Sequence, residues 1–540
     1  ASWTTDRLSV CRKPRPNRKS FVMRSTLRTR AARPPVQTSG VNARLTLTAV
    51  CVVVFMLLLD MTIVAAALSD IQSSFHAPLT GLQWVVDAYA LPMAGLLLTA
   101  ATVGDRLGRR RLYLGGLVVF MFASAGCALA RNIDVLNGLR AVQGSAGAVL
   151  LGVSLPMIAA AFPDVRHRAG AIAAYGAAMG AGGAVGPLLG GALVTAYGWP
   201  SIFLINLPVG VLALYIVIFA VPESVVAQSR PVDVWGTLVL TAALFAGVYV
   251  LIEGNRFGWS SPIMLGLSVF CVAGLAAFGW HEVRQAEPML DVRLLAGPGF
   301  AGVSLAAFAA SGTLIASTNY LALYFMNTLG FSPFDAGLRA LPLTLAIVVG
   351  APLAMLAARR IPVAATIPAG IALIAAGMWM MTAVNASTTW THFIAGSVVA
   401  GLGLGGLSAL TSDAALRFVP VADAGMATGT VSTARQIGIL AGVAGLGALF
   451  SRHAGDLARA RLPAMPQLSD GLAAGAGLRA LEVVPDRMRP ALATLAREAS
   501  AAGMHAALTA AAVAASVATV AVAMLIRMGA RQTIDTSTVD

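Results

Sequence analysis

The sequence contains little charge. Asp, Glu, Lys and Arg together make up 11% of its 540 residues, and only Lys13 and Lys19 are lysines. A water-soluble domain carries roughly 25% charged residues because they cover its surface. The composition therefore excludes a chain built from ordinary soluble domains.

Cysteine, histidine and phosphate-binding patterns are equally sparse. Three of the four cysteines, Cys51, Cys127 and Cys271, fall in apolar runs, and Cys11 lies in a basic stretch, so we expect no structural disulfide. The six histidines show no metal-ligand spacing, and the pattern Gly-x-x-x-x-Gly-Lys-Ser/Thr does not occur. We therefore expect no metal, no cofactor, no ATP-binding domain and no enzymatic activity.

Apolar residues dominate instead, at 58% of the chain and a mean hydropathy of +0.80. Runs of about 20 apolar residues recur, and each is long enough to cross a bilayer core of about 30 Å. Because no water is available there, each run predicts a helix. The fourteen runs cover residues 45–67, 81–102, 112–130, 136–161, 169–191, 201–222, 234–253, 262–280, 300–327, 334–357, 363–383, 391–416, 426–450 and 505–527. The sequence therefore predicts an all-α polytopic membrane protein.

The distribution of arginine predicts the orientation. An even number of spans places both termini on one side, and the short loops on the opposite side carry only Arg131 and Arg256. The short loops on the side of the termini carry twelve arginines: Arg106, Arg109, Arg110, Arg111, Arg166, Arg168, Arg230, Arg284, Arg293, Arg359, Arg360 and Arg417. Because short basic loops stay in the cytoplasm, we expect both termini to be cytoplasmic.

The first 44 residues hold 11 of the 37 lysines and arginines, and we expect a disordered cytoplasmic tail over 1–44. The net charge of +14 is thus explained by the tail and by orientation, and no nucleic-acid partner is expected. Met23 is an available start, so one hypothesis is that residues 1–22 are an over-extension or a scar. No apolar run precedes Leu45, so we expect no cleavable signal peptide.

Two linkers, 222–233 and 281–298, bracket a pair of spans at 234–280. Six spans precede the pair and six follow it, which predicts two six-helix bundles, over 45–222 and 300–527, with two inserted helices. Paired six-helix units are a known transporter architecture. A long outer loop, 451–504, includes a predicted helix near 489–504 that leads into the last span, and residues 528–540 form a cytoplasmic tail.

A charged turn, 103–111, joins the second and third spans. Gly108 supplies a positive φ at little cost, and Asp105 is the only acid among the arginines Arg106, Arg109 and Arg110. We expect Asp105 to dock to a helix N-terminus or to an arginine of the other bundle. The simpler interpretation is that the turn only anchors the orientation of the chain.

Three ionisable residues lie inside spans of the first bundle: Asp60, Asp87 and Arg140. At about 1.5 Å per residue, all three fall in the outer half of the bilayer. We expect them to share a hydrated cavity in which the two acids bind protons and Arg140 adjusts the pKa of these acids. The alternatives are a static ion pair and, for Arg140, a side chain that extends to the membrane interface.

A glycine-rich stretch fills the fifth span; its members are Gly182, Gly186, Pro187, Gly190 and Gly191. Small residues permit close helix packing and proline permits a kink, which a gate requires and which packing alone also explains. The residues considered for a substrate cavity are Trp84, Tyr89, Asn319, Tyr320 and Tyr324, with core packing as the equal alternative. Arg435, inside the thirteenth span, is either a pairing charge or a structural one.

Taken together, these motifs resemble those of the major facilitator superfamily, specifically its fourteen-span drug:proton antiporters of the multidrug efflux type. The 103–111 turn matches the signature between the second and third spans, with Ala101 where the family has glycine. Residues 182–191 look like the fifth-span antiporter motif, and the stretch from Arg140 to Gly144 is similar to a fourth-span motif associated with proton transfer. Leu59-Asp60-x-Thr62 and Trp84-x-x-Asp87-x-Tyr89 resemble first-span and second-span signatures. Acids found in later spans of some cation exporters have no counterpart here.

The resemblance implies a proton-coupled secondary exporter of hydrophobic drugs or toxic compounds, with cationic ones left open, in a bacterial inner membrane. It implies that Asp60 and Asp87 carry protons, and that Asp105 with its arginines closes an inner gate. We expect a monomer whose partners are small molecules, protons and the bilayer. The alternatives are a dedicated exporter of one metabolite, antibiotic or amino acid, and a membrane sensor or scaffold.

Overall fold

A computed structural model of the chain describes residues 40–223, 233–285, 288, 292–417 and 424–537. In these residues twelve helices are long and apolar enough to cross a membrane. Two further helices are bent, and counting each of them as one span raises the number to fourteen. Each of the fourteen predicted runs coincides with one such helix or with consecutive helical pieces. The predicted fold class, two six-helix bundles with two inserted helices, is confirmed.

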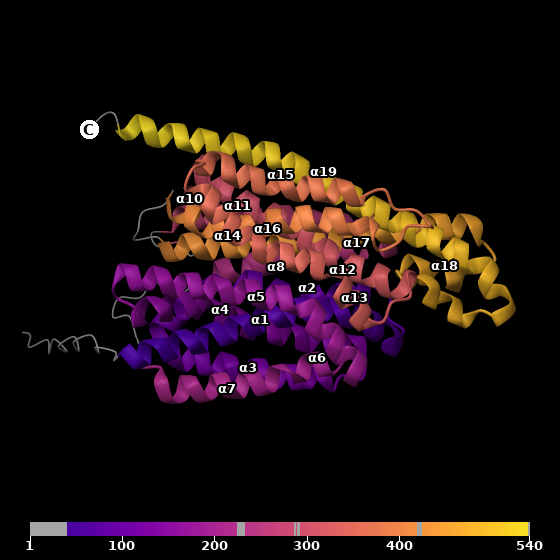
Figure 1. Cartoon of the computed structure of the whole chain (residues 1–540), viewed down its shortest axis with the longest axis horizontal. Helices are drawn as coiled ribbons and strands as arrows, with labels where there is room; N and C mark the ends of the chain where they lie inside the picture. The colour runs from indigo at the N-terminus through magenta and orange to yellow at the C-terminus, as the bar shows by residue number, and fades with distance from the viewer. Residues whose placement is uncertain (1–39, 224–232, 286–287, 289–291, 418–423, 538–540) are drawn as a thin grey trace, which may run out of the picture. The chain divides into compact units, whose positions relative to one another are not determined.

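The first bundle follows the chain order closely. Its helices are α1 (Gly40–Phe75), α2 (Leu79–Leu107), α3 (Arg109–Ala128), α4 (Ile133–Ala161), α5 (Val165–Tyr197), α6 (Ser201–Leu204) and α7 (Asn206–Ala220). α1 packs on α5, and α4 packs on both α2 and α3 (Figure 1). α1 begins at Gly40, inside the stretch expected to be a tail; residues 1–39 of that stretch lie outside the described residues.

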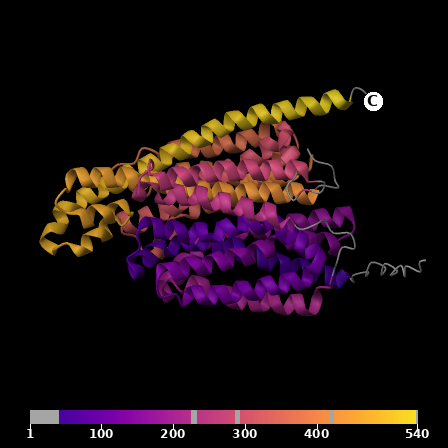
Figure 2. The same ribbon diagram turned by 180° about the vertical axis from the view of Figure 1, so that it is seen from behind.

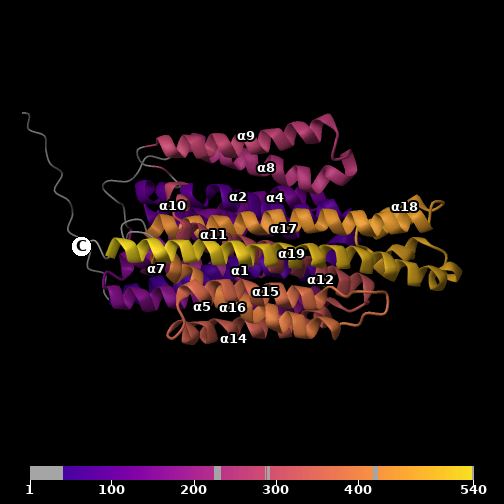
Figure 3. The same cartoon turned by 90° about the horizontal axis from the view of Figure 1, so that it is seen from above.

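The inserted pair and the second bundle complete the fold. The pair is α8 (Val234–Phe257) and α9 (Pro262–Arg284). The second bundle is built from consecutive helical pieces, several of which join end to end into one span. These pieces are α10 (Val292–Ala296), α11 (Pro298–Ala310), η1 (Ser311–Ile315), α12 (Ala316–Leu323), η2 (Tyr324–Thr328), α13 (Pro333–Arg339), α14 (Leu341–Ala358), α15 (Val363–Met381), α16 (His392–Arg417), α17 (Ala424–Arg461) and α19 (Arg489–Ser537). α8 packs against both α2 and α17, so the pair lies at the edge where the bundles meet (Figure 3).

The bundles meet along two seams. α2 packs against α17 on one side, and α5 packs against α13 and α14 on the other; the rear view shows the same two groups of helices (Figure 2). We call the end where α1 begins and α19 ends the terminal end, and the opposite end the far end. Both seam helices of the first bundle bend, α2 by 57° and α5 by 40°. Pro187 explains the second bend, because it cannot donate a hydrogen bond to the carbonyl of Gly183.

The segment between α17 and α19 lies at the far end. It contains α18 (Pro466–Ala473), η4 (Gly477–Val483) and η5 (Asp486–Met488), and α19 runs unbroken from Arg489 into the last span. The helix predicted to lead into that span is confirmed. A small apolar core that includes Leu468, Leu472 and Leu481 holds the segment together.

Candidate functional site

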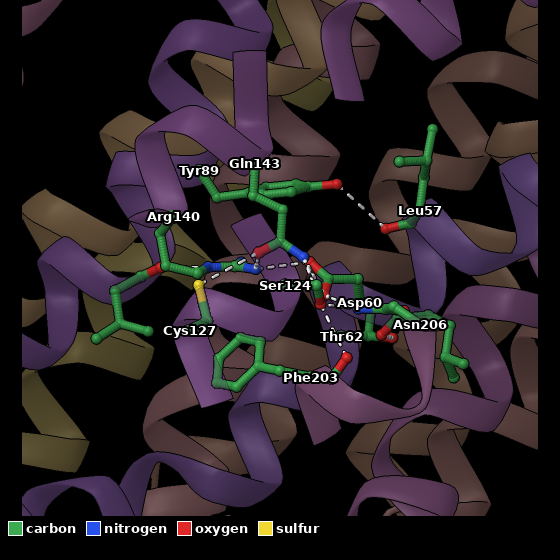
Figure 4. Close-up of polar contacts among 12 residues, drawn as sticks. Leu57, Asp60, Thr62, Tyr89, Ser124, Cys127, Arg140, Gln143, Phe203 and Asn206 are labelled. Carbon is green, nitrogen blue, oxygen red and sulfur yellow. Dashed lines mark hydrogen bonds and ion pairs between the residues drawn. The ribbon is translucent and has the colours of Figure 1, made fainter. Parts of the chain in front are cut away.

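Asp60 lies at the centre of a buried polar cluster in the first bundle (Figure 4). Its Oδ2 accepts a hydrogen bond from Arg140 Nη1 at 2.6 Å. Its Oδ1 accepts from Gln143 Nε2 at 2.9 Å and from Asn206 Nδ2 at 2.6 Å. Asp60 is 0% exposed and Arg140 is 1% exposed. Both oxygens of the carboxyl group are therefore bonded to donors inside the bundle, one of them a cation.

Arg140 is fixed on every side. Its Nε donates to the carbonyl of Val85 at 3.1 Å, and its Nη1 also donates to Gln143 Oε1 at 2.9 Å. The guanidinium carbon lies 4.3 Å from the ring centroid of Tyr89 and 5.7 Å from that of Phe203. The interpretation of Arg140 as a side chain that extends to the interface is wrong, because it points into the bundle.

Asp87 is buried elsewhere. It is 0% exposed, and neither carboxylate oxygen has a hydrogen-bond partner among the described residues. It lies close enough to Tyr320 of α12 for the two groups to interact electrostatically. One turn away, Gln83 Nε2 donates to the carbonyls of Val443 and Ala444 on α17, both at 3.2 Å. Asp87 thus faces the seam between the bundles, where α2 meets α17 and α12.

The expectation of one hydrated cavity shared by Asp60, Asp87 and Arg140 is corrected by this geometry. Asp60 and Arg140 form a closed ion pair inside the first bundle, whereas Asp87 turns toward the second bundle and makes no hydrogen bond to either of them. Their positions along the spans predict a similar depth for all three residues. Depth along a helix does not determine the direction in which a side chain points. Asp60 points into the first bundle, whereas Asp87 points toward the second.

Three of the five residues considered for the substrate cavity make packing contacts instead. The Trp84 ring lies 5.6 Å from Phe245 on α8, and Tyr324 lies 5.9 Å from Phe393. Tyr89 covers the guanidinium of Arg140. Asn319 is buried and donates to the carbonyl of Ala316 within its own helix. Tyr320 differs, because its hydroxyl donates to the carbonyl of Val443 at the seam.

The charged turn 103–111 is held within the first bundle. Asp105 Oδ1 accepts from Arg109 Nε and pairs with its Nη2, both at 2.8 Å, and Arg109 Nη1 reaches the carbonyl of Pro156. The turn depends on Gly108, whose φ is +105°. The expected docking of Asp105 to an arginine of the other bundle is not what this conformation shows; its arginine partner lies four residues along the chain.

Glu223, at the end of the sixth span, organises the same turn. Its two carboxylate oxygens accept from the backbone N–H groups of Arg110 and Arg111, at 3.0 and 3.2 Å, and so cap the start of α3. A Cβ on Gly108 would lie 2.8 Å from the Glu223 carboxyl carbon. Gly108 is therefore required both for its backbone conformation and for the approach of Glu223. Arg106 is exposed.

The glycines of α5 face two different partners. Cβ atoms on Gly182 and Gly186 would collide with Phe55 and Thr62 of α1, and one on Gly190 would lie 2.7 Å from Ile63 Cγ1. Gly191, one position further along α5, faces the second bundle instead. A Cβ on Gly191 would collide with the backbone of α13 at Pro333, and the carbonyl of Pro187 lies against Gly337. α5 is thus a close-packed joint between the two bundles.

These findings can be set beside known proteins. The sequence matches the model of the Major Facilitator Superfamily over residues 50–443. The chain belongs to the major facilitator superfamily. It is 37% identical to the multidrug resistance protein Stp of Mycobacterium tuberculosis, covering 75% of this chain and 76% of that protein. It is 32% identical to the tetracenomycin C resistance and export protein of Streptomyces glaucescens, covering 89% and 91%.

Solved structures agree on the fold. The crystal structure of a bacterial homologue of the human lysosomal transporter Spinster, inward-facing and unoccupied, superposes with a TM-score of 0.63. It is 18% identical, with coverage of 91% of this chain and 98% of that one. A bacterial homologue of the human drug peptide transporters PepT1 and PepT2 gives a TM-score of 0.59 at 17% identity, with coverage of 91% and 99%.

Four polar residues of the site were not predicted: Ser124, Asn206, Glu223 and, as a partner of Asp60, Gln143. Ser124 Oγ accepts from Asn206 Nδ2 at 3.0 Å, which links α3 and α7 to the cluster. A signal was present for Asn206, because an amide inside the apolar run 201–222 needs a partner. In the described part of the chain no three His, Cys, Asp or Glu side chains gather as a metal site would need.

Proposed function

We propose that this chain is a proton-coupled exporter of hydrophobic small molecules, and that Asp87 is the carboxyl that binds the proton. The observation that carries the proposal is the contrast between two buried acids in one bundle. Asp60 has a cation and two amide donors, whereas both Asp87 oxygens lack a partner among the described residues. Burying an ionised carboxylate without a partner costs several kcal/mol, so the Asp87 carboxyl is stable here only with a proton.

The position of Asp87 supports a coupling role. It lies at the α2–α17 seam, which must change when a superfamily member opens first to one side and then to the other. A carboxyl that is neutral in one conformation and ionised in another binds its proton on one side of the membrane and releases it on the other. Asp60 acts differently: its bonds to Arg140, Gln143 and Asn206 fix α1, α4 and α7 to one another.

Orientation and direction follow from the charge distribution and from the relatives. The twelve arginines that the sequence predicts in the short loops on the side of the termini support a cytoplasmic terminal end. Relatives are named for multidrug resistance and for resistance to or export of single antibiotics. These names support export of small molecules out of the cell. A monomeric exporter that uses protons and no ATP is part of the proposal. The names of the relatives are compatible with both a broad and a narrow substrate range.

The decisive experiment measures proton-driven accumulation. In inside-out proteoliposomes with an acidic lumen, wild-type protein should accumulate ethidium or neutral hydrophobic dyes until a protonophore is added. Asp87→Asn should lose accumulation but keep dye exchange down a concentration gradient. Asp134→Asn, an exposed acid at the start of α4, is the matched control and should behave as wild type. Accumulation by Asp87→Asn at the wild-type rate would refute its role.

Two alternatives to a multidrug exporter, a dedicated exporter and a membrane sensor or scaffold, give different experimental results. A dedicated exporter would protect cells against one compound in a susceptibility screen run with and without a protonophore, whereas a multidrug exporter would protect against several. A membrane sensor or scaffold would give no flux of any compound in the proteoliposomes. The buried pair of Asp60 and Arg140 fits a multidrug exporter, a dedicated exporter and a sensor alike. The measurement of flux therefore separates these three functions.

A further inference from the structure

A short turn of the segment between α17 and α19 contacts the first bundle. This turn, Ala474–Arg479, leads from α18 into η4 at the far end, and we call it the far-end strap. Its conformation depends on Gly477, whose φ is +53° and where a Cβ would lie 2.6 Å from the carbonyl oxygen of Asn327. The strap is therefore folded closely over the end of η2.

Three hydrogen bonds and one ion pair join the strap to the far end of α1. Arg479 Nη1 donates to Ser73 Oγ at 2.8 Å and to the carbonyl of Ser69 at 3.2 Å. The same atom lies 3.6 Å from Asp70 Oδ1. Gln72 Nε2 donates to the carbonyl of Ala474 at 2.9 Å. These bonds place the Arg479 cation at the C-terminal end of α1, where the helix dipole favours a positive charge.

A buried amide ties the strap to both bundles at once. Asn327 Nδ2, on η2, donates to the carbonyl of Gly475 at 2.9 Å and to Gln72 Oε1 at 3.0 Å. Its Oδ1 accepts from Ser69 Oγ at 2.5 Å. Asn327 is 1% exposed and Ser69 is 0% exposed. η2 is a single π-helical turn, a distortion that is often found at functional positions.

The strap belongs mechanically to the second bundle. It lies within the segment that joins α17 to α19, and the core residues of that segment, Leu468, Leu472 and Leu481, pack on Ala458 of α17 and on Ala496 and Ala499 of α19. α1, by contrast, packs mainly within the first bundle, on α5 and α7, and has smaller contacts with α12 and α13 of the second bundle. If the two bundles separate at the far end, the contacts of Arg479 and Gln72 must break, because each joins one bundle to the other.

We propose that the far-end strap is a latch that holds the far end closed, and that its release from α1 is a required step in opening that end. The charged turn 103–111 lies at the terminal end, so the latch is a separate device on the opposite side. The proposal rests on the alternating opening that the proposed transport requires. Its main test needs neither substrate nor a proton gradient, so it can fail or succeed independently of that function.

The test measures the far-end distance in purified full-length protein in nanodiscs. The four cysteines are replaced by serine, and spin labels are attached at Leu129→Cys and Ala383→Cys, two exposed far-end positions on different bundles. Pulsed electron paramagnetic resonance then gives the ratio of long to short distances. Arg479→Ala removes charge-assisted hydrogen bonds to α1 and should raise this ratio by about 10-fold to 100-fold.

A neighbouring arginine provides the matched control. Arg487 is exposed on the same segment, and Arg487→Ala should leave the distance ratio unchanged. Ser73→Ala, which removes one acceptor and leaves the charge in place, should give a smaller shift in the same direction as Arg479→Ala. An unchanged ratio in Arg479→Ala, or an equal change in Arg479→Ala and Arg487→Ala, overturns the proposal.

A reversible cross-link tests whether release is required. Ser73→Cys and Arg479→Cys, joined by a short bis-methanethiosulfonate, tie the strap to α1. The tied protein should give only the short far-end distance when it is labelled orthogonally at positions 129 and 383 with unnatural amino acids, and reduction should restore the long one. A long distance in the fully cross-linked protein would show that the far end opens without release, which contradicts the latch.

Discussion

Replacing Asp60 by asparagine leaves the Arg140 guanidinium buried without its counter-charge. Arginine does not lose its proton in a protein, so the positive charge remains in an apolar bundle. Removing one partner of a buried ion pair costs about 3–5 kcal/mol. Arg140 keeps the carbonyl of Val85, Gln143 Oε1 and the face of Tyr89. We therefore expect the lower part of that range, a loss of about 3 kcal/mol in the free energy of unfolding.

Asp87→Asn should behave in the opposite way. The Asp87 carboxyl has no hydrogen bond to lose among the described residues, and asparagine has nearly the same shape as a protonated aspartate. The cost is limited to one unsatisfied amide, about 1 kcal/mol. The two substitutions make the same chemical change at a similar depth, yet we expect stabilities about 2 kcal/mol apart. Asp60→Asn should be the unstable variant, and Asp87→Asn the folded but uncoupled one.

The assay is equilibrium unfolding in bicelles titrated with a denaturing detergent and followed by the fluorescence of the eight tryptophans. Adding Arg140→Gln to Asp60→Asn removes the stranded charge, so the double variant should be more stable than the sum of the single effects predicts. A loss below about 1 kcal/mol for Asp60→Asn, with additive effects in the double variant, would refute the fixed-pair interpretation of this site.

Other predictions concern the turn 103–111 and the α5 joint. Glu223→Gln should lower the melting temperature by weakening the cap on α3, at a cost of about 1 kcal/mol, and unchanged melting would contradict the capping role. Asp105→Asn should slow dye transport in proteoliposomes more than it weakens dye binding; equal effects would argue against a gate. Gly191→Ala should push α5 from α13 and destabilise the closed far end by about 1–3 kcal/mol in the spin-label assay. Gly183→Ala, with open space around its Cβ, is the control.

The sequence predicted the spans well because a bilayer imposes one strong rule on them. An apolar run of about 20 residues between charged turns must be a helix, so fourteen spans and their order could be derived. The packing of α5 was predictable for a similar reason. Gly182, Gly186 and Gly190 recur every four residues, a spacing that places them on one face. The partner of that face, α1, could not be derived, because spacing does not identify the neighbouring helix.

The sequence failed where the result depends on rotation about a helix axis or on distant contacts. Asp60 and Asp87 were placed at similar depth, but only the structure shows that one faces Arg140 and the other faces α17. Trp84 was considered for the cavity, yet its ring packs on Phe245 of α8. The contact of Arg479 with Ser69 joins residues 410 positions apart. No local pattern reports such a contact.

On the proposed function, the proton on Asp87 and the closed far end depend on each other. The buried Asp87 carboxyl is stable at the α2–α17 seam only when it is neutral, so losing the proton costs this conformation several kcal/mol. Reversing a two-state population from 1:99 to 99:1 needs about 5.5 kcal/mol, and the far-end strap contributes only about 1–3 kcal/mol. One buried carboxylate therefore supplies a free energy of the size needed to overcome the strap. We therefore expect loss of the Asp87 proton to favour opening of the far end even when the strap contacts are intact.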